Sequence, residues 1–466
     1  MTTDVNLREL VLEILLAVTR DGEYSHTVIR GMLEKYQYLG KQERSFLKRV
    51  SEGTLEQMIW IDYVINQFSN VRVNKMKPQI RCILRSSVYE LKFMDSIPAS
   101  ATCNEAVKLA QKRGFRSLKG FVNGVLRGIS RNLEDISLPD AGQEPVRYLS
   151  VKYSMPEWVI ELWRNSYSLE ETERILETFL ARTPTSIRVN PLKTTAAELK
   201  SELTAQGIAV ALSEETPGAL YLENYDFLGK IPAFQEGKFY VQDVSSMQVA
   251  RWAKPKPGDF VMDVCASPGG KSIQMAEMLW AAEQEERPCR GTEDNGVCGY
   301  EKEGQVPACG MVEARDLTEH KVSLIQENIA RCGLSNIRAV QADARVFDET
   351  QAGKADIVVA DLPCSGLGVL GRKPDIKYRV TPEDCRELCA LQREILHTVQ
   401  QYVKPQGILM YSTCTINPME NEENVRWFLE EHPDFELERQ QQILPVKGKN
   451  DGFFLAKLRK EANRKI

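Results

Sequence analysis

The second half of the chain, from about residue 236, alternates short apolar segments with longer amphipathic ones, and this alternation limits the possible folds more strongly than any other feature. The apolar segments predict strands over residues 259–266, 310–315, 337–342, 356–363 and 407–413. The amphipathic segments predict helices over residues 269–284, 318–333, 382–403 and 420–432. Strands that alternate with helices form a parallel sheet that helices cover on both faces. We therefore predict an α/β domain whose ligands bind beyond the carboxyl ends of the strands.

The first part of the chain follows a helical pattern instead. Apolar residues recur at three- and four-residue spacing in LRELVLEILLAV, TLEQMIWIDYVINQF and IRCILRSSVYELKFM, so residues 1 to about 140 are expected to be all-helical. The polar, proline-containing stretch 133–145 is typical of a linker. Two more helices are expected up to about residue 182. A strand (185–190), a helix opened by a threonine cap and a second strand (209–215) then predict a small α+β module.

Together these patterns predict a multi-domain chain: an all-α domain over 1–145, linker helices with a small α+β module over 146–235, and an α/β domain over 236–466. The length of 466 residues agrees with two or three domains. No basic flank precedes an apolar run at the N-terminus, and no apolar run is long enough to span a bilayer, so we expect a cytoplasmic protein. The 11 cysteines lack the spacing of a disulfide framework and are expected to be reduced.

Charge is distributed unevenly along the chain. The formal net charge of −5 argues against a simple polyanion binder, yet residues 103–131 hold seven basic side chains and one acidic one. A local basic surface can bind nucleic-acid phosphates, although an ordinary solvated helical face explains the charge equally well. The candidate phosphate contacts in this stretch and in the strand at 185–190 are Lys112, Arg113, Arg116, Lys119, Arg127 and Arg188.

A glycine turn follows the first predicted strand of the α/β domain, in DVCASPGGKS (263–272). Its last letters look like a nucleotide-phosphate loop, but that motif needs a glycine where this chain has Cys265. The dinucleotide pattern G-x-G-x-x-G is excluded as well, because Gly269 and Gly270 are adjacent. The turn still allows a ligand to approach the backbone closely, since these two residues carry no side chain.

Carboxylates at the ends of the next two predicted strands complete a set that suits a nucleoside. Asp316 is placed to accept both hydroxyl hydrogens of a ribose, and Asp343 is placed to accept an amino group of a base. With the glycine turn they fit a nucleoside cofactor without a phosphate chain, of which S-adenosyl-L-methionine (SAM) is the common one. Taken singly, each aspartate is explained equally well as a cap of the loop that follows its strand.

Two cysteines end the fourth and fifth predicted strands, in ADLPC and YSTC. Carbon 5 of cytosine is a poor nucleophile, but a thiolate that adds to carbon 6 makes it enamine-like and able to attack a sulfonium methyl group. One cysteine is sufficient for this attack, and a second can assist the closing steps. Asp361 can hydrogen-bond the ring nitrogen or the exocyclic amine and stabilise the adduct. From the residues alone, either Cys364 or Cys414 can be the nucleophile.

With these motifs the chain resembles a known family. DVCASPGGKS, ADLPCSGLGVLGRKPDIKYR and YSTCTINPMENEENV are similar to motifs of the RNA cytosine-5 methyltransferases of the Nol/Nop/Sun superfamily. TCNEAVKLAQKRGFRSLKGFVNGVLRGISR resembles the NusB-type RNA-binding domain, and the C-terminal DGFFLAKL adds to the likeness to the bacterial RsmB (Sun, Fmu) group. The resemblance covers nearly the whole chain. It implies an all-α NusB-like domain, a small α+β RNA-binding module and a Rossmann-like, class I SAM-dependent methyltransferase domain.

The resemblance also implies an activity, which is SAM-dependent methylation of carbon 5 of cytosine 967 in 16S rRNA through a covalent cysteine adduct. It gives nucleophilic attack to Cys414 and adduct resolution to Cys364, and it places Asp361 beside both cofactor and base. It implies that Asp316 binds the ribose of SAM and that Asp343 lies at its adenine. The implied cofactor turn consists of Cys265, Ala266, Ser267, Pro268, Gly269, Gly270 and Lys271, the last of which is also a candidate contact to the target base.

The chain departs from the family pattern in a polar insertion over about residues 283–309. This insertion contains Cys289, Cys298 and Cys309, whose spacing lacks the close pairs of most zinc sites. We therefore predict a surface insertion and no metal.

The expected partner is 16S rRNA or a small-subunit assembly intermediate, with no DNA, no membrane and a monomeric chain. Two other functions compete with this one. The first is a non-catalytic NusB-like RNA-binding or assembly factor, against which the retention of both Cys364 and Cys414 argues. The second is a DNA cytosine methyltransferase, which the helical RNA-type domain and the absence of an obvious DNA-reading helix or zinc module disfavour.

Overall fold

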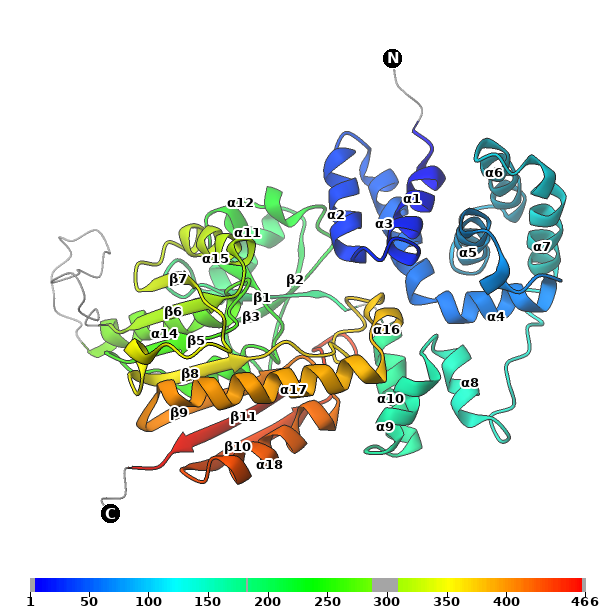
Figure 1. Cartoon of the computed structure of the whole chain (residues 1–466). Coiled ribbons are helices and arrows are strands. Elements are labelled where there is room, and N and C mark those ends of the chain that lie inside the picture. The colour runs from blue at the N-terminus through cyan, green and yellow to red at the C-terminus, as the bar shows by residue number, and fades with distance from the viewer. Residues whose placement is uncertain (1–4, 182, 287–308, 463–466) are drawn as a thin grey trace. The chain divides into compact units, whose positions relative to one another are not determined.

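A computed structural model of the chain describes residues 5–181, 183–286 and 309–462. The chain divides into two compact units, which Figure 1 shows with their elements labelled. The first unit comprises Met1–Leu180 and Leu370–Arg379, and the second comprises Ala181–Val369 and Val380–Ile466. Within the described ranges, no helix is both long enough and apolar enough to cross a membrane.

The first unit is helical, as the spacing of its apolar residues predicts. Helix α5 (Pro78–Phe93) packs against α1, α3, α4, α6 and α7, and every residue from Cys82 to Glu90 is buried. Pro78 suits the first turn of this helix, because the N–H that proline lacks would have no helical partner there. The other elements are α1 (Leu7–Thr19), α2 (Ser25–Lys35), α3 (Lys41–Glu56), α4 (Met58–Phe68), η1 (Val73–Lys75), α6 (Ala99–Lys112), η2 (Arg116–Leu118) and α7 (Lys119–Arg131).

Three further helices follow the linker and belong to the same unit. The two that the sequence predicts are α9 (Glu157–Arg164) and α10 (Leu169–Leu180), and a shorter helix, α8 (Pro145–Lys152), precedes them. α8 packs against α4, so these helices extend the helical unit rather than joining the small α+β module. The contact pattern therefore differs here from the predicted boundary at residue 145.

A segment from late in the chain, Leu370–Arg379, completes the first unit and ends in α16 (Ile376–Arg379). The Ser25 hydroxyl donates a hydrogen bond to Asp375 Oδ1 at 2.5 Å, and Lys377 Nζ donates to the Glu56 carbonyl oxygen at 2.7 Å. The predicted α/β domain over 236–466 includes these ten residues, because nothing in their sequence pattern separates them from the strand before and the helix after.

A four-stranded antiparallel sheet with strand order β2-β3-β1-β4 forms the small module of the second unit. The predicted strands are β1 (Thr185–Val189) and β2 (Ala209–Leu212), and the predicted helix is α11 (Ala196–Ala205), whose first turn Thr195 caps by accepting a hydrogen bond from the Glu198 N–H. The remaining elements are β3 (Ala219–Glu223), η3 (Leu228–Lys230), α12 (Pro232–Gln235) and β4 (Phe239–Val241).

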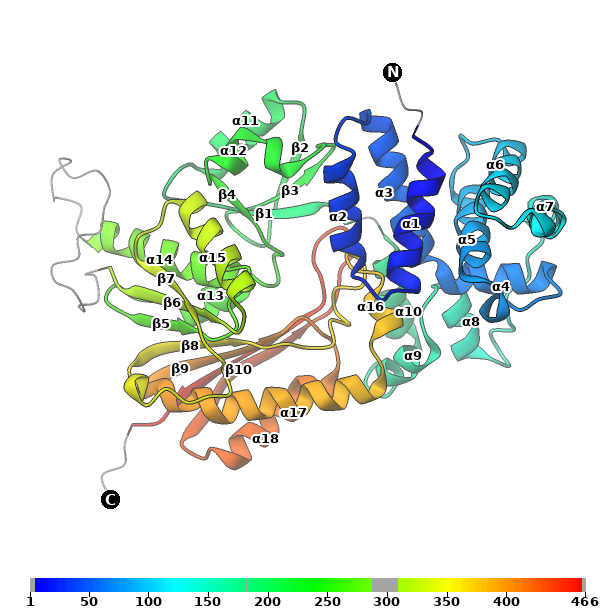
Figure 2. The ribbon, with the colours of Figure 1, turned by 45° about the horizontal axis from the view of Figure 1, so that its top comes forward.

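A seven-stranded sheet with strand order β10-β11-β9-β8-β5-β6-β7 supports the rest of the second unit. Helices α13 (Gln248–Ala253), α14 (Gly270–Glu286) and α15 (Glu319–Cys332) cover one face, and α17 (Pro382–Val399) and α18 (Glu422–Glu431) cover the other (Figure 2). The five parallel strands are the five that the sequence predicts: β5 (Phe260–Asp263), β6 (Met311–Asp316), β7 (Ile337–Gln341), β8 (Ala355–Asp361) and β9 (Val403–Thr413).

The order of the parallel strands in the sheet changes direction at the boundary between β5 and β8. Strands β6 and β7 lie on one side of β5, and β8 and β9 lie on the other, so the connections cross opposite faces. Such a reversal opens a crevice at the carboxyl ends of the central strands, where open α/β sheets bind their ligands. Short helical turns η4 (Glu349–Gln351), η5 (Gln400–Tyr402) and η6 (Pro418–Glu420) complete the loops at the two ends.

Two antiparallel strands, β10 (Phe435–Ile443) and β11 (Phe453–Lys460), extend the sheet beyond β9. Neither strand is among the predicted elements. β10 lies at the sheet edge, and much of it is exposed, so its sequence FELERQQQI carries little apolar periodicity.

Candidate active site

The turn after β5 is held against neighbouring elements. The Tyr240 hydroxyl donates a hydrogen bond to the Pro268 carbonyl oxygen at 2.9 Å. Gly269 has a φ of +104°, which residues with side chains rarely adopt. A Cβ on Gly270 would lie 3.1 Å from the Tyr240 ring, so a side chain at this position would crowd that ring. The turn therefore leads directly into α14 with its backbone close to Tyr240.

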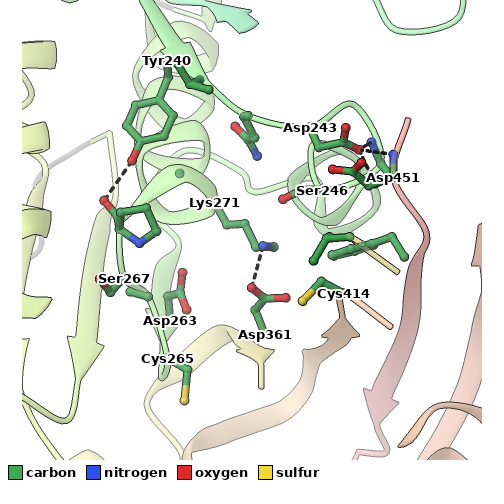
Figure 3. A pocket seen from close by; sticks show the side chains of 18 residues that line it. Tyr240, Asp243, Ser246, Asp263, Cys265, Ser267, Lys271, Asp361, Cys414 and Asp451 are labelled. Carbon is green, nitrogen blue, oxygen red and sulfur yellow. Dashed lines mark hydrogen bonds and ion pairs between the residues drawn. The ribbon is translucent and has the colours of Figure 1, made fainter. Parts of the chain in front are cut away.

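A cavity of about 240 Å³ lies beside this turn, at the carboxyl ends of β5, β8 and β9 (Figure 3). The predicted site residues that line it are Cys265, Ala266, Ser267, Pro268, Gly270, Lys271, Asp361 and Cys414. The lining residues that the prediction missed are Tyr240, Val241, Gln242, Asp243, Ser245, Ser246, Asp263, Val369, Asp451 and Phe453. Gly269, Asp316, Asp343 and Cys364 lie outside this lining. Most of the predicted site is thus brought together around one cavity.

Asp263, the last residue of β5, places a buried carboxyl group in the cavity wall. The Ser272 hydroxyl donates to its Oδ2 at 2.6 Å, while its Oδ1 is buried without a hydrogen-bond partner among the described residues. Burial raises the pKa of Asp263 to about 7. A carboxyl oxygen of this kind is suited to a polar ligand, because an unsatisfied buried acceptor costs free energy.

Asp316 and Asp343 end or follow the next two strands, as predicted, but their surroundings differ. Asp316 is buried, and its Oδ2 accepts a hydrogen bond from the Ser267 N–H of the turn at 3.0 Å. Lys321 lies 3.0 Å from its Oδ1. Asp343 forms an ion pair with Arg345 at 2.7 Å, and the hydrogen bonds from Arg345 hold the pKa of that carboxyl below its ordinary value. Asp316 therefore contacts the turn directly, whereas Asp343 is bound to its own loop.

Lys271 and Asp361 form an ion pair within the cavity, with Nζ and Oδ2 2.6 Å apart. The Ser412 hydroxyl donates to the other oxygen of Asp361 at 2.7 Å. Burial by itself would lower the pKa of Lys271, but the charge of Asp361 and its hydrogen bond raise that pKa above its ordinary value. Figure 3 shows Lys271 pointing toward Asp361, with the Cys414 thiol beside the pair. The pair thus fixes one cation and one carboxylate next to a cysteine.

Cys364 and Cys414 lie side by side at the ends of β8 and β9. Their Sγ atoms are 3.1 Å apart, and the Cys414 N–H donates to Cys364 Sγ at 3.2 Å. The hydrogen bond with Cys414, followed by burial, raises the pKa of the Cys364 thiol well above its ordinary value. Cys364 is therefore a neutral thiol in contact with the cysteine that lines the cavity.

The basic residues predicted to contact phosphates lie mostly on the surface of the first unit. Arg116, Lys119 and Arg127 are exposed, whereas Lys112 forms an ion pair with Glu9 at 2.6 Å. Arg113 is half-buried and forms ion pairs with the carboxylates of α1. A second cavity of about 410 Å³ lies between α6 and α7 and is lined by Asn104, Val107, Lys108, Lys119, Gly120 and Asn123.

Arg188 is not a surface residue, and its prediction as a phosphate contact is wrong. Only 6% of it is exposed, its Nε donates to Gln242 Oε1 at 2.8 Å, and it forms an ion pair with the buried Glu277 of α14. The alternation in TSIRVN does put Arg188 on the polar face of β1, but α14 contributes Glu277 to cover that face. Arg188 therefore joins the small module to α14, which packs on the seven-stranded sheet of the second unit.

The insertion lies mainly outside the described residues, and so do Cys289 and Cys298. Cys309 is described and is buried next to β6. Among the described residues, no group of three or more metal-ligating side chains is close enough to hold a metal ion.

Eight of the ten missed cavity residues come from two stretches of the chain, and the other two are Asp263 and Val369. Residues 240–246, in YVQDVSS, place polar side chains directly after the short strand β4. Asp451 and Phe453 lie in DGFF, at the start of β11, and the Phe453 ring is 5.4 Å from Lys271 Nζ. Both stretches reach the cavity only through antiparallel strand pairings that the sequence analysis did not include.

Family models match three parts of the chain. The model of the 16S rRNA methyltransferase RsmB/F family matches residues 304–459, and the NusB family model matches residues 5–131. The ferredoxin-like domain of RsmF/B-like methyltransferases matches residues 155–226.

Relatives match over nearly the whole chain. A probable ribosomal RNA small subunit methyltransferase B of Bacillus subtilis is 36% identical, over 98% of this chain and 99% of the relative. The corresponding protein of Synechocystis is 30% identical over 98% of this chain and 100% of the relative. The crystal structure of PH0851 is similar over 99% of this chain and 100% of that chain, with a TM-score of 0.78 and 26% identity.

NSun6 from Pyrococcus horikoshii, whose structure was determined with SFG, shares the fold alone. It has a TM-score of 0.52 and 23% identity over 66% of this chain and 98% of its own. The whole-length relatives agree with the three family models, which follow one another along the chain in the order that the sequence predicts. The chain therefore belongs to the ribosomal RNA small subunit methyltransferase B family and is a SAM-dependent methyltransferase of small-subunit ribosomal RNA.

Proposed function

We propose that this enzyme methylates carbon 5 of one cytosine in 16S rRNA, cytosine 967 by the family resemblance, through a covalent bond between Cys414 and carbon 6 of the base. The observation that carries the proposal is the thiol pair, in which Cys364 Sγ and Cys414 Sγ are 3.1 Å apart. Cys414 lines the same cavity as Lys271 and Asp361. A single cysteine is most often a small apolar residue, but two adjacent thiols beside a cation and a carboxylate supply the groups that this chemistry requires.

The residues around the turn after β5 fit SAM, which when bound supplies its methyl group as an electrophile. Gly270 lines the cavity without a side chain, and the buried Oδ1 of Asp263 has no hydrogen-bond partner among the described residues. We assign binding of the cofactor to the turn 265–271 and to Asp263. Asp316 would accept hydrogen bonds from the ribose hydroxyls, and Asp343 would lie at the adenine.

Cys414 begins the chemistry as a thiolate. Its sulfur forms a bond to carbon 6, and the electron pair of the C5=C6 double bond moves toward carbon 5, which becomes nucleophilic. Carbon 5 would then form a bond to the methyl group that the bound cofactor supplies, and the electron pair of the broken sulfur–methyl bond would stay on the cofactor sulfur. Asp361 accepts a hydrogen bond from the exocyclic amine of the base. The positive charge of Lys271, 2.6 Å from Asp361, stabilises the electron-rich ring.

Cys364 assists the release of the methylated base. The proton on carbon 5 passes to water, and the electron pair of that C–H bond restores the C5=C6 double bond. As this double bond forms, the bond between carbon 6 and sulfur breaks, with its electron pair on Cys414. The Cys364 thiol donates a hydrogen bond to this sulfur and so stabilises the departing thiolate, because hydrogen bonds to charged acceptors are the stronger ones.

The first unit is proposed to bind the RNA backbone through its exposed basic residues Arg116, Lys119 and Arg127. Lys112 and Arg113 would exchange their ion pairs with Glu9 for RNA phosphates. The target base must leave its stack before it can reach Cys414.

A covalent-trapping experiment tests the proposal. The Cys364→Ala variant is incubated with SAM and unmodified 16S rRNA and is run on a denaturing gel. We expect a covalent protein–RNA band, because the variant forms the adduct and resolves it slowly. The band should disappear when Cys414→Ala is added, or when cytosine 967 of the RNA is replaced by uridine. Cys103→Ala, which changes a buried cysteine of the first unit, is the matched control and should give no stable band.

Each other outcome overturns a separate part of the proposal. A band that survives without Cys414 means that another residue is the nucleophile. If Cys364→Ala gives no band while the wild type still transfers methyl groups, Cys364 is not the residue that resolves an adduct formed by Cys414. If the wild type neither forms an adduct nor methylates cytosine, a non-catalytic NusB-like RNA-binding or assembly factor becomes the leading interpretation.

A further inference from the structure

Glu420 is a buried carboxylate that the proposed steps do not use, although it lies between the loops that carry the two cysteines. It is the last residue of η6 and has no exposed surface. Its Oε2 accepts hydrogen bonds from the Ser365 N–H at 2.8 Å and from Gln392 Nε2 at 3.1 Å. Its Oε1 accepts from Asn417 Nδ2 at 2.9 Å. Three N–H donors therefore hold both oxygens of this buried carboxyl group.

These contacts fix the backbone on both sides of Cys364. The N–H of Ser365, the residue after it, is held by Glu420, and the carbonyl oxygen of Pro363, the residue before it, accepts from Gln392 Nε2 at 2.8 Å. The hydroxyls of Ser365 and Thr415 are also 2.9 Å apart. The Cys364 loop is therefore bound to the turn that follows Cys414.

The same turn fixes Cys414. Asn421, the residue after Glu420, accepts a hydrogen bond from the Thr413 hydroxyl at 2.6 Å and donates one to the Thr415 carbonyl oxygen at 3.1 Å. Thr413 and Thr415 are the two neighbours of Cys414 in the chain. The segment 417–421 thus holds both cysteine loops, and Glu420 is its charged member.

We propose that Glu420 is a positioning residue that assigns different tasks to the two cysteines. Its carboxylate binds the Cys364 loop to the turn after Cys414, and its negative charge keeps Cys364 protonated while Cys414 acts as the nucleophile. This inference rests on the proposed function of the two thiols. Its physical basis is that a fixed negative charge disfavours a second anion nearby, most strongly where water is excluded. Glu420 adds in this way to the hydrogen bond with Cys414 and the burial that raise the pKa of Cys364.

Two of the other titratable groups around the Cys364 loop, Cys385 and Tyr411, are neutral. Burial raises the pKa of Cys385, on α17, to about 12. Burial also raises the pKa of Tyr411, on β9, well above its ordinary value. Cys414 shares the hydrogen bond described above, and Lys271 of α14 acts electrostatically on Cys414. Removing the charge of Glu420 should therefore have a measurable effect on the titration of Cys364.

The first test needs no RNA. Alkylation of Cys364 by iodoacetamide is measured by peptide-level mass spectrometry from pH 6.5 to pH 10 in the wild type, in Glu420→Gln and in Glu423→Gln. Glu423 is an exposed carboxylate three residues away and supplies the matched control. We expect the Glu420→Gln profile to shift by at least about one pH unit to lower pH, which makes alkylation about tenfold faster at pH 8.5. The Glu423→Gln profile should match the wild type.

A purely structural role predicts a different result. A loosened loop would raise the alkylation rate by the same factor at every pH and leave the midpoint unchanged, and that outcome overturns the inference. If Glu420→Gln does not fold, Glu420→Asp replaces it. This variant withdraws the charge from Ser365 by one methylene, so a profile shifted to lower pH relative to Glu423→Gln supports the inference, and an unshifted one contradicts it.

The second test measures the decay of the covalent protein–RNA band after a pulse of SAM. We expect Glu420→Gln to slow this decay at least tenfold and Glu420→Asp to restore most of the rate, whereas equal decay in all variants overturns the positioning role. If no adduct forms in any variant, Cys364→Ala included, the proposed function itself fails. The alkylation profile still decides the role of Glu420 in that case.

Discussion

The carboxyl-end edge of the large sheet and the basic face of the first unit both hold charged side chains, but they hold them in different ways. At the sheet edge, Lys271, Asp361 and Glu420 are each fixed by a hydrogen bond or ion pair of 2.8 Å or less in a largely buried environment. On the helical face, Arg116, Lys119 and Arg127 extend into solvent. Fixed, buried charges suit chemistry, because they need not reorganise during the reaction, whereas mobile, exposed charges suit binding of a flexible polyanion. Substitutions at the edge should therefore have large and specific effects, and those on the face should have small and additive ones.

Removal of the nucleophile should give the largest effect. Cys414→Ala is expected to reduce methyl transfer from SAM to 16S rRNA by at least about 10⁴-fold, because the neighbouring Cys364 is a protonated thiol and a poor nucleophile. Transfer of a radioactive methyl group measures this loss. Cys332→Ala, at the end of α15, is the control that should lower stability and leave the rate per folded molecule unchanged. A residual rate within tenfold of the wild type would contradict the assignment.

The second-largest effect is expected from removing Arg188, the buried cation that joins β1 to α14. Arg188→Ala leaves Glu277 buried without its ion-pair partner, so the free energy of unfolding should fall by about 3–5 kcal/mol. Urea denaturation followed by circular dichroism measures it. Arg116→Ala, on the exposed face, should change the same quantity by less than about 0.5 kcal/mol. Similar effects of the two variants would remove the distinction between the buried and the exposed arginine.

The buried carboxyl group of Asp263 should make the free energy of unfolding depend on pH. Burial raises its pKa in the folded protein to about 7, above the ordinary value of 3.8 that applies to the unfolded chain. Between these two pKa values, the folded state retains a proton that the unfolded chain loses. The contribution of this proton to the free energy of unfolding is therefore complete below about pH 4 and is lost as the pH rises through 7. It amounts to roughly 4 kcal/mol at most. Asp263→Asn should be stabilised relative to the wild type at pH 8 but not at pH 4, as urea unfolding at both values would show. A difference that does not change with pH would refute this.

The smallest effects are expected on the basic face. Arg116→Ala, Lys119→Ala and Arg127→Ala should each weaken RNA binding several-fold and reduce the slope of log affinity against log salt by about one. Filter binding at several salt concentrations measures both quantities. Arg147→Ala, an exposed arginine paired with Glu144, is the control and should leave the slope unchanged. An unchanged slope in all four variants would place the RNA elsewhere on the molecule.

The sequence could predict the parts of the fold whose residues are buried on a regular period. The five parallel strands, the four long helices beside them and the helical first unit belong to this class. β10 could not be predicted in the same way, because an edge strand exposed along much of its length has little apolar periodicity. The packing of Leu370–Arg379 with the first unit could not be predicted either, since it depends on contacts such as Ser25 with Asp375 that are far apart in the sequence.

The candidate site also contains residues that a local sequence pattern indicates and residues that only long-range packing brings to it. The turn at 265–271, Asp361 and the two cysteines could be predicted, because the ends of parallel strands share one edge whatever the remaining packing. Tyr240, Asp243 and Asp451 reach the cavity through β4 and the start of β11, which no local pattern indicates. Arg188 shows the reverse error, since alternation in a strand separates two faces but does not reveal which polar face a later helix will cover.

The position of Leu370–Arg379 in the first unit has a consequence for the order in which the protein matures during synthesis. Helices α1 to α10 leave the ribosome first, but the segment that supplies Asp375 and Lys377 to Ser25 and Glu56 follows only after most of the second unit has been made. At bacterial and eukaryotic translation rates this interval lasts on the order of ten seconds or more. The earliest part of the molecule to be synthesised is therefore among the last to be completed. A nascent chain that stalls before residue 370 would present an unfinished helical unit to chaperones and proteases.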